Sequence, residues 1–130
     1  MATSSSRTST SAGHTGQPDV RFRLRIRKGE LLAIGPGKVA LLEAIAEHGS
    51  ISAAARSLGM SYRRAWLLVD ELNRALSAPA TESGPGGASG GGSTLTPVGK
   101  RIVALYRGIE ARAHEACLDQ IKELTALMKP

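Results

Sequence analysis

The sequence predicts a mainly α-helical fold with two small β-hairpins (α+β), and three features of its 130 residues support this prediction. Apolar residues recur with helical spacing in two segments that meet at Gly59. The same spacing returns after Pro97 and continues to Met128. An alternating stretch that ends near Gly29 and a glycine-rich stretch over residues 78–93 are instead typical of hairpins.

Composition and charge fit one small domain with an N-terminal tail. Residues 1–19 are rich in Ser, Thr and Gly and carry too little apolar surface to offset the entropy of ordering, so we expect a disordered tail. This tail lacks the apolar segment of a secretory signal, and no apolar run is long enough to cross a membrane, so a cytoplasmic protein is expected. The formal net charge of +6 favours an anionic partner. Cys117, the only cysteine, excludes an internal disulfide and a cysteine-rich zinc site.

The first hairpin is predicted from the strict alternation of residues 21–27. Lys28-Gly29 is the expected turn, and residues 30–34 are the expected return strand. The four arginines either form a solvated face that protects an edge strand, or reach phosphate groups or a second subunit. The other face of this strand carries the apolar residues Phe22, Leu24 and Ile26.

The first helix is predicted between two breaks in the apolar pattern. Gly35-Pro36-Gly37 ends the hairpin, and Pro36 suits the first turn of a helix. The helix is expected to end at His48, with Gly49 as its stop. Its apolar positions are Val39, Leu41, Leu42, Ile45 and Ala46.

The next two helices are predicted to form a pair with a sharp turn between them. The first covers residues 52–58, and its alanines at 53–55 make it thin enough to lie closely against its neighbour. Gly59 supplies the positive φ that the turn needs. Ser61 caps the longer second helix, which runs to about Ser77. Such a pair is typical of a helix-turn-helix, whose second helix reads DNA.

The helical period gives the second helix one apolar face, on which we expect Trp66 to be structural. Arg63 and Arg64 lie in the first turn and point away from that face, and we expect one to read a base and the other to contact a phosphate. Leu67 lies nearly opposite the face and either contacts a thymine methyl group or packs on a neighbouring element. The predicted face consists of Tyr62, Ala65, Trp66, Val69, Leu72 and Leu76.

The second hairpin and a long last helix complete the chain. Residues 78–93 are predicted to be a flexible loop, with Thr94-Leu95-Thr96 as the return strand. Pro97 then opens a helix whose long apolar stripe requires a partner, most simply a second copy of the chain. We therefore divide the chain into a tail (1–19), a DNA-binding domain (20–96) and a dimerisation helix (97–130). The expected dimer residues are Ile102, Tyr106, Ile109, Ala113, Cys117, Ile121, Leu124 and Met128.

Three segments resemble the DNA-binding domain of the molybdate-responsive ModE regulators: residues 49–55, 61–66 and 90–99. The Ser-Tyr-x-x-Ala-Trp pattern at 61–66 is the discriminating one, because the more distant LysR-type regulators lack the tryptophan. The resemblance covers residues 20–129 and implies a dimeric winged helix-turn-helix regulator. In that family the oxyanion is bound by C-terminal domains that follow the long helix, whereas this sequence ends at Pro130. The resemblance therefore does not imply direct molybdate binding, and no cofactor is expected.

Further DNA contacts are expected on either side of the reading helix. Ser52 opens the helix that crosses the DNA backbone, where free N–H groups favour phosphate, and Arg56 is a candidate for the same role. Glycines allow the wing to approach the sugar-phosphate chain closely, where hydroxyl and amino groups supply donors. The complete set of predicted DNA-binding residues is Ser52, Arg56, Ser61, Tyr62, Arg63, Arg64, Leu67, Ser93, Thr94 and Lys100.

These features predict a sequence-specific transcriptional regulator that acts as a homodimer on an inverted repeat, with half-sites about 34–36 Å apart or a multiple of that. The alternative is an adaptor or architectural DNA-binding protein that partners a full-length regulator. An enzyme is not expected, because the three histidines are scattered and the glycine-rich stretch lacks the Gly-Lys-Ser/Thr of a phosphate-binding loop. No metal-binding pattern is present either.

Overall fold

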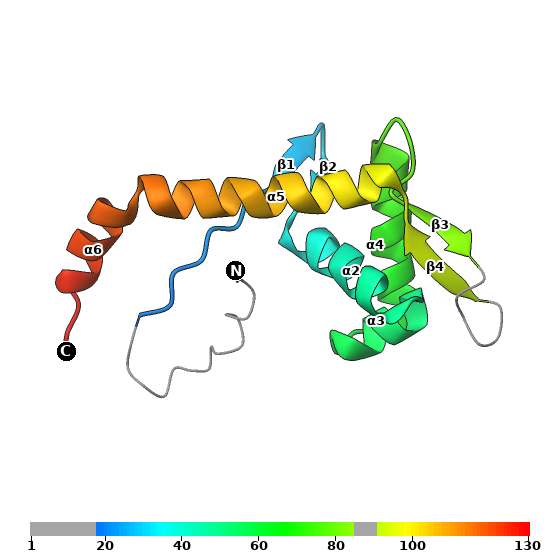
Figure 1. Cartoon of the computed structure of the whole chain (residues 1–130), viewed down its shortest axis with the longest axis horizontal. Coiled ribbons are helices and arrows are strands. Elements are labelled where there is room, and N and C mark those ends of the chain that lie inside the picture. Colours follow the sequence, from blue (N-terminus) through cyan, green and yellow to red (C-terminus); the bar gives the residue numbers. More distant parts are fainter. Residues whose placement is uncertain (1–17, 85–90) are drawn as a thin grey trace. The chain divides into compact units, whose positions relative to one another are not determined.

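The computed structural model describes residues 18–84 and 91–130 (Figure 1). Most of the predicted disordered tail and residues 85–90 of the predicted loop lie outside these residues, so the prediction of a disordered tail stays untested. The prediction of a loop over residues 78–93 is wrong near both of its ends, where residues 81–84 and 92–93 belong to strands. The chain divides into two compact units. The larger unit is residues 23–111, and the smaller one combines residues 112–130 with the N-terminal part up to Phe22.

The described residues form five helices and two antiparallel hairpins, which confirms the predicted fold class. The order is β1 (Ile26–Lys28), β2 (Leu31–Ile34), α2 (Pro36–His48), α3 (Ile51–Ser57), α4 (Tyr62–Ala75), β3 (Thr81–Gly84), β4 (Gly92–Leu95), α5 (Pro97–Ala116) and α6 (Leu118–Ala126).

The three central helices begin and end close to the predicted residues. Gly49 ends α2 with a φ of 81°, and Gly59 makes the turn between α3 and α4 with a φ of 71°, both in the left-handed region that glycine tolerates. Ser50 caps α3 by accepting a hydrogen bond from the N–H of Ala53 at 3.0 Å. Ser61 caps α4 in the same way, accepting from the N–H of Arg64 at 3.1 Å.

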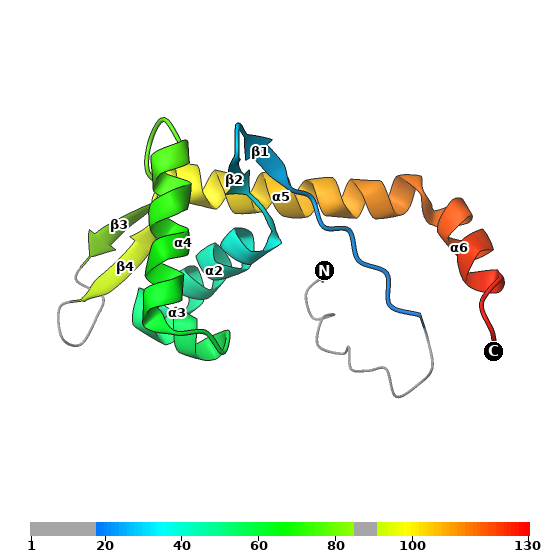
Figure 2. The same ribbon diagram turned by 180° about the vertical axis from the view of Figure 1, so that it is seen from behind.

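The core of the larger unit lies between α2, α3 and α4 (Figures 1 and 2). Ala54 and Ala55 are almost fully buried, which confirms that α3 is thin where it lies against its neighbours. Ala46 is exposed although the sequence placed it on the apolar side of α2. The largest fully buried side chains are Leu41, Leu42, Ile45, Leu72 and Val39.

The first hairpin is shorter than predicted. β1 begins at Ile26 instead of residue 21, and the turn falls at Gly29 and Glu30. β2 has only four residues before the chain enters α2, so the residues before Ile26 find no partner strand. Ile26 is 44% exposed, whereas Phe22 and Leu24, predicted on the same strand face, are half-buried.

A buried lysine that the sequence did not indicate fastens this hairpin to the helices. The amino group of Lys38, at the start of α2, donates a hydrogen bond to the carbonyl of Leu32 in β2. The same amino group lies 3.1 Å from a carboxylate oxygen of Glu71 in α4. The hairpin therefore lies beside the C-terminal half of α4.

The second hairpin, the wing, is fastened at its base to α4 and α2. The side chain of Asn73 accepts a hydrogen bond from the N–H of Ala80 at 2.7 Å and donates one to the hydroxyl of Thr81 at 3.2 Å. On the other strand, the N–H of Ser93 donates to the carbonyl of Gly49 at 2.9 Å. These bonds fix the direction in which the wing leaves the helices.

The last helix is interrupted, in contrast to the single helix predicted. α5 ends at Ala116 and α6 begins at Leu118, with Cys117 between them at φ −106° and ψ 11°. The N–H of Cys117 still bonds to Ala113, and its carbonyl accepts from Ile121, so the break is a local turn. No helix within the described ranges is both long and apolar enough to span a lipid bilayer.

Candidate nucleic-acid interface

The start of α4 presents a cationic, solvent-exposed surface. Arg63 and Arg64 are both exposed, as the sequence predicted, because Ala65 next to them takes the core position. Neither guanidinium, nor that of Arg56 on α3, forms an ion pair among the residues that the structure describes. Their charge is therefore available to an anionic partner.

Two aromatic residues of α4 are exposed, which corrects the prediction that they belong to the core. Tyr62 is 55% exposed and Trp66 is 46% exposed. Ala65, Val69 and Leu72 already fill the contact with α2 and α3, so the aromatic side chains lie at the edge of the apolar face. Trp66 therefore belongs to the surface of the reading helix.

Trp66 also forms one wall of a cleft between α4 and the wing. The opposite wall comes from Thr81, Glu82 and Ser83 of β3. Leu67, one residue further along α4, is 40% exposed, as its place opposite the core face predicted. The exposed apolar surface of α4 thus continues towards the wing.

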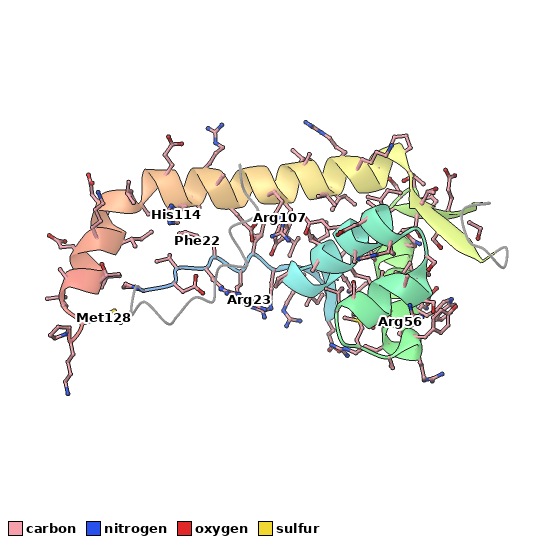
Figure 3. All side chains as sticks on the ribbon, turned by 60° about the horizontal axis from the view of Figure 1, so that its bottom comes forward. Phe22, Arg23, Arg56, Arg107, His114 and Met128 are labelled. Atoms are coloured by element: carbon pink, nitrogen blue, oxygen red, sulfur yellow. The ribbon has the colours of Figure 1, made fainter. Side chains whose placement is uncertain are left out.

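The predicted contacts on α3 are exposed at the same end of the molecule as the start of α4 (Figures 1 and 2). Ser52 is free to meet solvent, because Ser50 provides the cap. Arg56 extends from the outer side of α3 (Figure 3). α3 and α4 together therefore carry, near one turn, three arginines that form no ion pair with any other described residue.

The wing contributes fewer contacts than predicted. Ser93 is only 8% exposed and its N–H is bonded to the carbonyl of Gly49, so it is a fastening residue and its backbone offers no donor to a ligand. Thr94 is exposed on β4, and Lys100 is exposed in the first turn of α5. These two residues remain candidate contacts.

The acidic groups near this surface are few, and one is neutralised. Asp70 lies on α4 and pairs with Arg74 one turn further on, at 3.1 Å. Glu82 is exposed on β3 in the cleft beside Trp66. The start of α4 therefore carries the positive charge, and the cleft beside the wing is the less favourable place for a phosphate.

Sequence reasoning missed the residues that hold the wing in place. Thr96 accepts a hydrogen bond from the N–H of Gly99 at 3.1 Å, donates one to the carbonyl of Pro79 at 2.7 Å, and so caps α5 while tying it to the wing. Asn73 likewise ties α4 to the wing, through its hydrogen bonds to Ala80 and Thr81. The available signal was a threonine directly before Pro97, the preferred pattern at a helix start, whereas nothing in the sequence distinguishes Asn73 from the other polar residues of α4.

The residues predicted for dimerisation occupy different environments. Ile102 packs against the core, and Tyr106 is 2% exposed and donates a hydrogen bond to the carbonyl of Leu24 at 2.8 Å. Ile109 is 47% exposed, and the neighbouring Leu105, which was not predicted, is 48% exposed. In the smaller unit, Ala113 and Ile121 are half-buried and the exposed predicted residues are Cys117, Leu124 and Met128.

Known proteins resemble this chain in sequence over the same elements. Residues 37–100 match the family described as bacterial regulatory helix-turn-helix proteins of the lysR family. The molybdenum-pterin-binding protein MopB of Rhodobacter capsulatus is 51% identical over 78 residues, which are 60% of this chain and 29% of MopB. The DNA-binding transcriptional dual regulator ModE of Escherichia coli K12 is 34% identical over 111 residues, 85% of this chain and 41% of ModE.

A third relative and a solved structure extend the comparison. The molybdenum transport protein ModE of Azotobacter vinelandii is 40% identical over 91 residues, 70% of this chain and 33% of that protein. The chain thus spans well under half the length of these relatives. A crystal structure of a CbnR DNA-binding domain bound to DNA has the same fold, with a TM-score of 0.52 at 21% identity, covering 68% of this chain and 95% of that domain.

Proposed function

We propose that the chain is a DNA-binding transcriptional regulator, because residues 37–100 match the lysR-type family of bacterial regulatory helix-turn-helix proteins and because ModE and MopB proteins are relatives of the chain. In this proposal the chain reads a specific sequence in the major groove with α4 and acts as a homodimer on an inverted repeat. The names of the relatives make molybdenum-linked genes the first targets to test.

The observation that carries the proposal is the exposed surface of α4. A helix packed on one side by Ala65, Val69 and Leu72 leaves two arginines and three large apolar side chains in solvent on its other sides. Exposed apolar groups of this size mark a contact surface when they lie together. The exposed residues are Tyr62, Arg63, Arg64, Trp66 and Leu67.

Each of these residue types has a chemical counterpart in the major groove. The planar guanidinium of arginine matches O6 and N7 of guanine with two hydrogen bonds, and an apolar side chain packs on a thymine methyl group. We assign base reading to Arg63 and Leu67, which lie one turn apart on α4, and a phosphate contact to Arg64. Trp66 lies beside Leu67 on the wing side and adds apolar contact area.

The neighbouring elements supply contacts to the DNA backbone. Arg56 and Ser52 on α3, Thr94 on β4 and Lys100 in the first turn of α5 are exposed and are the candidate contacts. Contacts of this kind fix the register of a protein on DNA without reading sequence. The fastening of the wing by Asn73 supports this assignment, because it holds the wing at a defined distance from α4.

The apolar face of α5 supports the homodimer. Leu105 and Ile109 lie one turn apart on the helix surface and are each about half exposed. A second copy of the same helix would cover both, and an antiparallel pair related by a two-fold axis would set two α4 helices in successive major grooves. We therefore place the dimer contact on Leu105 and Ile109, beside Ile102.

The test compares binding of purified wild-type protein and of Arg63→Ala and Arg64→Ala variants to duplexes selected from genomic DNA. Loss of a base-reading arginine costs about 1–3 kcal/mol and relaxes specificity, whereas loss of a phosphate contact weakens binding to all sequences and reduces the salt slope by about one. Arg112→Ala, an exposed arginine on α5, is the matched control. Trp66, the only tryptophan, reports binding through its emission without a label.

Two outcomes separate this proposal from its alternative. Weaker binding by the α4 variants with an unchanged dimer supports a DNA reader. If both variants bind DNA as the wild type does, the helix-turn-helix is only a scaffold, and the adaptor function takes the place of the regulator.

A further inference from the structure

The strongest charge cluster outside the α4 surface precedes the first helix. Arg23, Arg25, Arg27 and Lys28 place four cations within six residues, with no acidic residue among them. All four are exposed, and none forms an ion pair within the described part of the chain. We refer to these four residues as the arginine arm.

The arginine arm is held in place by α5. The hydroxyl of the buried Tyr106 donates a hydrogen bond to the carbonyl of Leu24, which lies between Arg23 and Arg25. Leu24 is half-buried while both arginines beside it are exposed, so the segment alternates as an extended chain does. Arg27 and Lys28 follow within β1, whose partner β2 is tied to α2 by Lys38.

The arginine arm and the reading surface lie towards opposite ends of α4. Lys38 joins Leu32 of β2 to Glu71, nine residues beyond Tyr62, which corresponds to about 14 Å along the helix axis. Figures 1 and 2 agree with this placement: the first hairpin lies near the end of α4, and α3 lies near its start. The arginine arm therefore lies away from the start of α4, the part of that helix that carries the reading surface.

We propose that the arginine arm binds the phosphate backbone of a second DNA segment, so that one protein holds two segments at once. The inference rests on the proposed function, because it takes DNA as the ligand of α4. It adds a second, sequence-independent site and an architectural role, the bridging of two duplexes or of two parts of one looped molecule.

The chemistry of the arm favours DNA over an acidic protein segment. Guanidinium groups bind phosphate oxygens with two parallel hydrogen bonds, and residues two apart on an extended chain repeat about every 6.6 Å, which suits a regular row of charges. DNA already bound at α4 also raises the local concentration of a second segment of the same molecule. An acidic partner protein is left as an outcome of the test.

The experiment uses the full chain and two duplexes. A duplex carrying a selected site is immobilised and loaded with protein, and capture of a fluorescent duplex of unrelated sequence is then measured. The test variant is Arg23→Gln/Arg25→Gln/Arg27→Gln. The control variant, Arg101→Gln/Arg112→Gln/Lys122→Gln, removes the same charge from exposed positions of α5 and α6.

We expect the wild type and the control variant to capture the second duplex and the arm variant to capture about tenfold less. Binding of the arm variant to the immobilised duplex should stay within about twofold of wild type. Capture by wild type should fall steeply with salt, with a slope set by about three to four phosphates.

Three results would overturn the inference. Undiminished capture by the arm variant excludes the arm as the second site. Equal loss of binding to both duplexes means that the arm contacts the same segment as α4. If sedimentation shows that the arm variant is no longer a dimer, the loss of capture follows from the lost dimer, and the arm contacts the second subunit instead of DNA. Failure of the proposed function is distinct, because it appears as wild-type binding by the Arg63→Ala and Arg64→Ala variants.

Discussion

At Gly99 the first turn of α5 meets the backbone of the wing so closely that a side chain has no room. A Cβ atom there would lie 2.1 Å from the carbonyl oxygen of Ala80, and Ala80 itself is fixed by Asn73 and by the N–H of Thr96. Because the obstacle is a backbone atom in a bonded network, it cannot move aside as a flexible side chain does. Gly99 is thus the residue that lets α5 start directly on the wing.

We expect Gly99→Ala to lower the free energy of unfolding by about 1–3 kcal/mol, the typical cost of overpacking. Urea unfolding followed by circular dichroism measures the change. Gly37→Ala is the matched control: it lies in α2 with open space around a Cβ, and it should be neutral or stabilise by about 0.5–1 kcal/mol. Equal stability of the Gly99→Ala protein would contradict the close approach.

Tyr106 gives the fold a specific dependence on alkaline pH. Burial raises the pKa of Tyr106 above its ordinary value of 10.0, and the nearby Glu110 carboxylate adds to this rise. The unfolded chain therefore releases this proton at a lower pH than the folded chain, so the contribution of Tyr106 to stability is fully present below pH 10 and is lost above it.

Above pH 10, the free energy of unfolding should fall more steeply with pH for wild type than for Tyr106→Phe. The variant should also lose on the order of 1 kcal/mol at neutral pH, because the carbonyl of Leu24 loses its donor. Tyr62→Phe is the control, since Tyr62 is largely exposed. Parallel pH curves for wild type and Tyr106→Phe would contradict the account.

At the scale of elements, the orientation of the wing depends on one side chain of α4. Asn73 bonds both to Ala80, just before β3, and to Thr81, its first residue, so it fixes where the strand begins. The rest of the wing base is held by Thr96 and by the contact between Ser93 and Gly49. The wing is therefore set by hydrogen bonds more than by apolar packing.

We expect Asn73→Ala to cost about 1–3 kcal/mol of unfolding free energy, since it leaves a backbone N–H without its partner. Amide hydrogen exchange should show faster exchange at Ala80 and in β3, with α2 and α3 unchanged. Ser83→Ala, an exposed residue of the same hairpin, should alter neither quantity. Unchanged exchange in β3 would show that Asn73 does not hold the wing.

The elements with a local signal in the sequence were predicted almost to the residue. Gly49, Gly59 and the cap at Ser61 act through neighbouring residues only, so their pattern can be read along the chain. The cap at Ser50 was not predicted, because the helix was expected to begin at Ser52. The length of β1 could not be predicted in this way, because it depends on how many residues β2 offers as a partner. The exposure of Trp66 follows from how closely α4 packs against α2 and α3, where Ala65, Val69 and Leu72 already fill the contact. The helical period of α4 alone carries no information about that packing.

At the scale of the whole molecule, α5 has an exposed apolar face, which the proposed dimer would cover. The apolar period correctly predicted that α5 has such a face, but it included Tyr106, which the structure buries, and omitted Leu105, which it exposes. The reason is that the N-terminal segment covers Tyr106 through Leu24, a contact between residues far apart in the sequence. The surface left for a second copy is therefore centred on Leu105 and Ile109.

Leu105→Glu/Ile109→Glu is expected to convert a dimer into a folded monomer, because two buried charges cannot face each other across a two-fold axis. Sedimentation equilibrium measures the mass, and circular dichroism confirms the fold. Ala104→Glu/Ala111→Glu, which adds the same charges to another exposed side of α5, should stay dimeric. A wild-type protein that is monomeric at micromolar concentration would contradict the dimer.

The most direct test of the central claim is selection of fragments from sheared genomic DNA at near-physiological salt, carried out in parallel with wild type and with Arg63→Ala/Arg64→Ala. We predict that wild type enriches one inverted-repeat motif and that the double variant does not. Uniform recovery of all fragments, collapsing as the salt concentration rises, would contradict sequence-specific reading by α4.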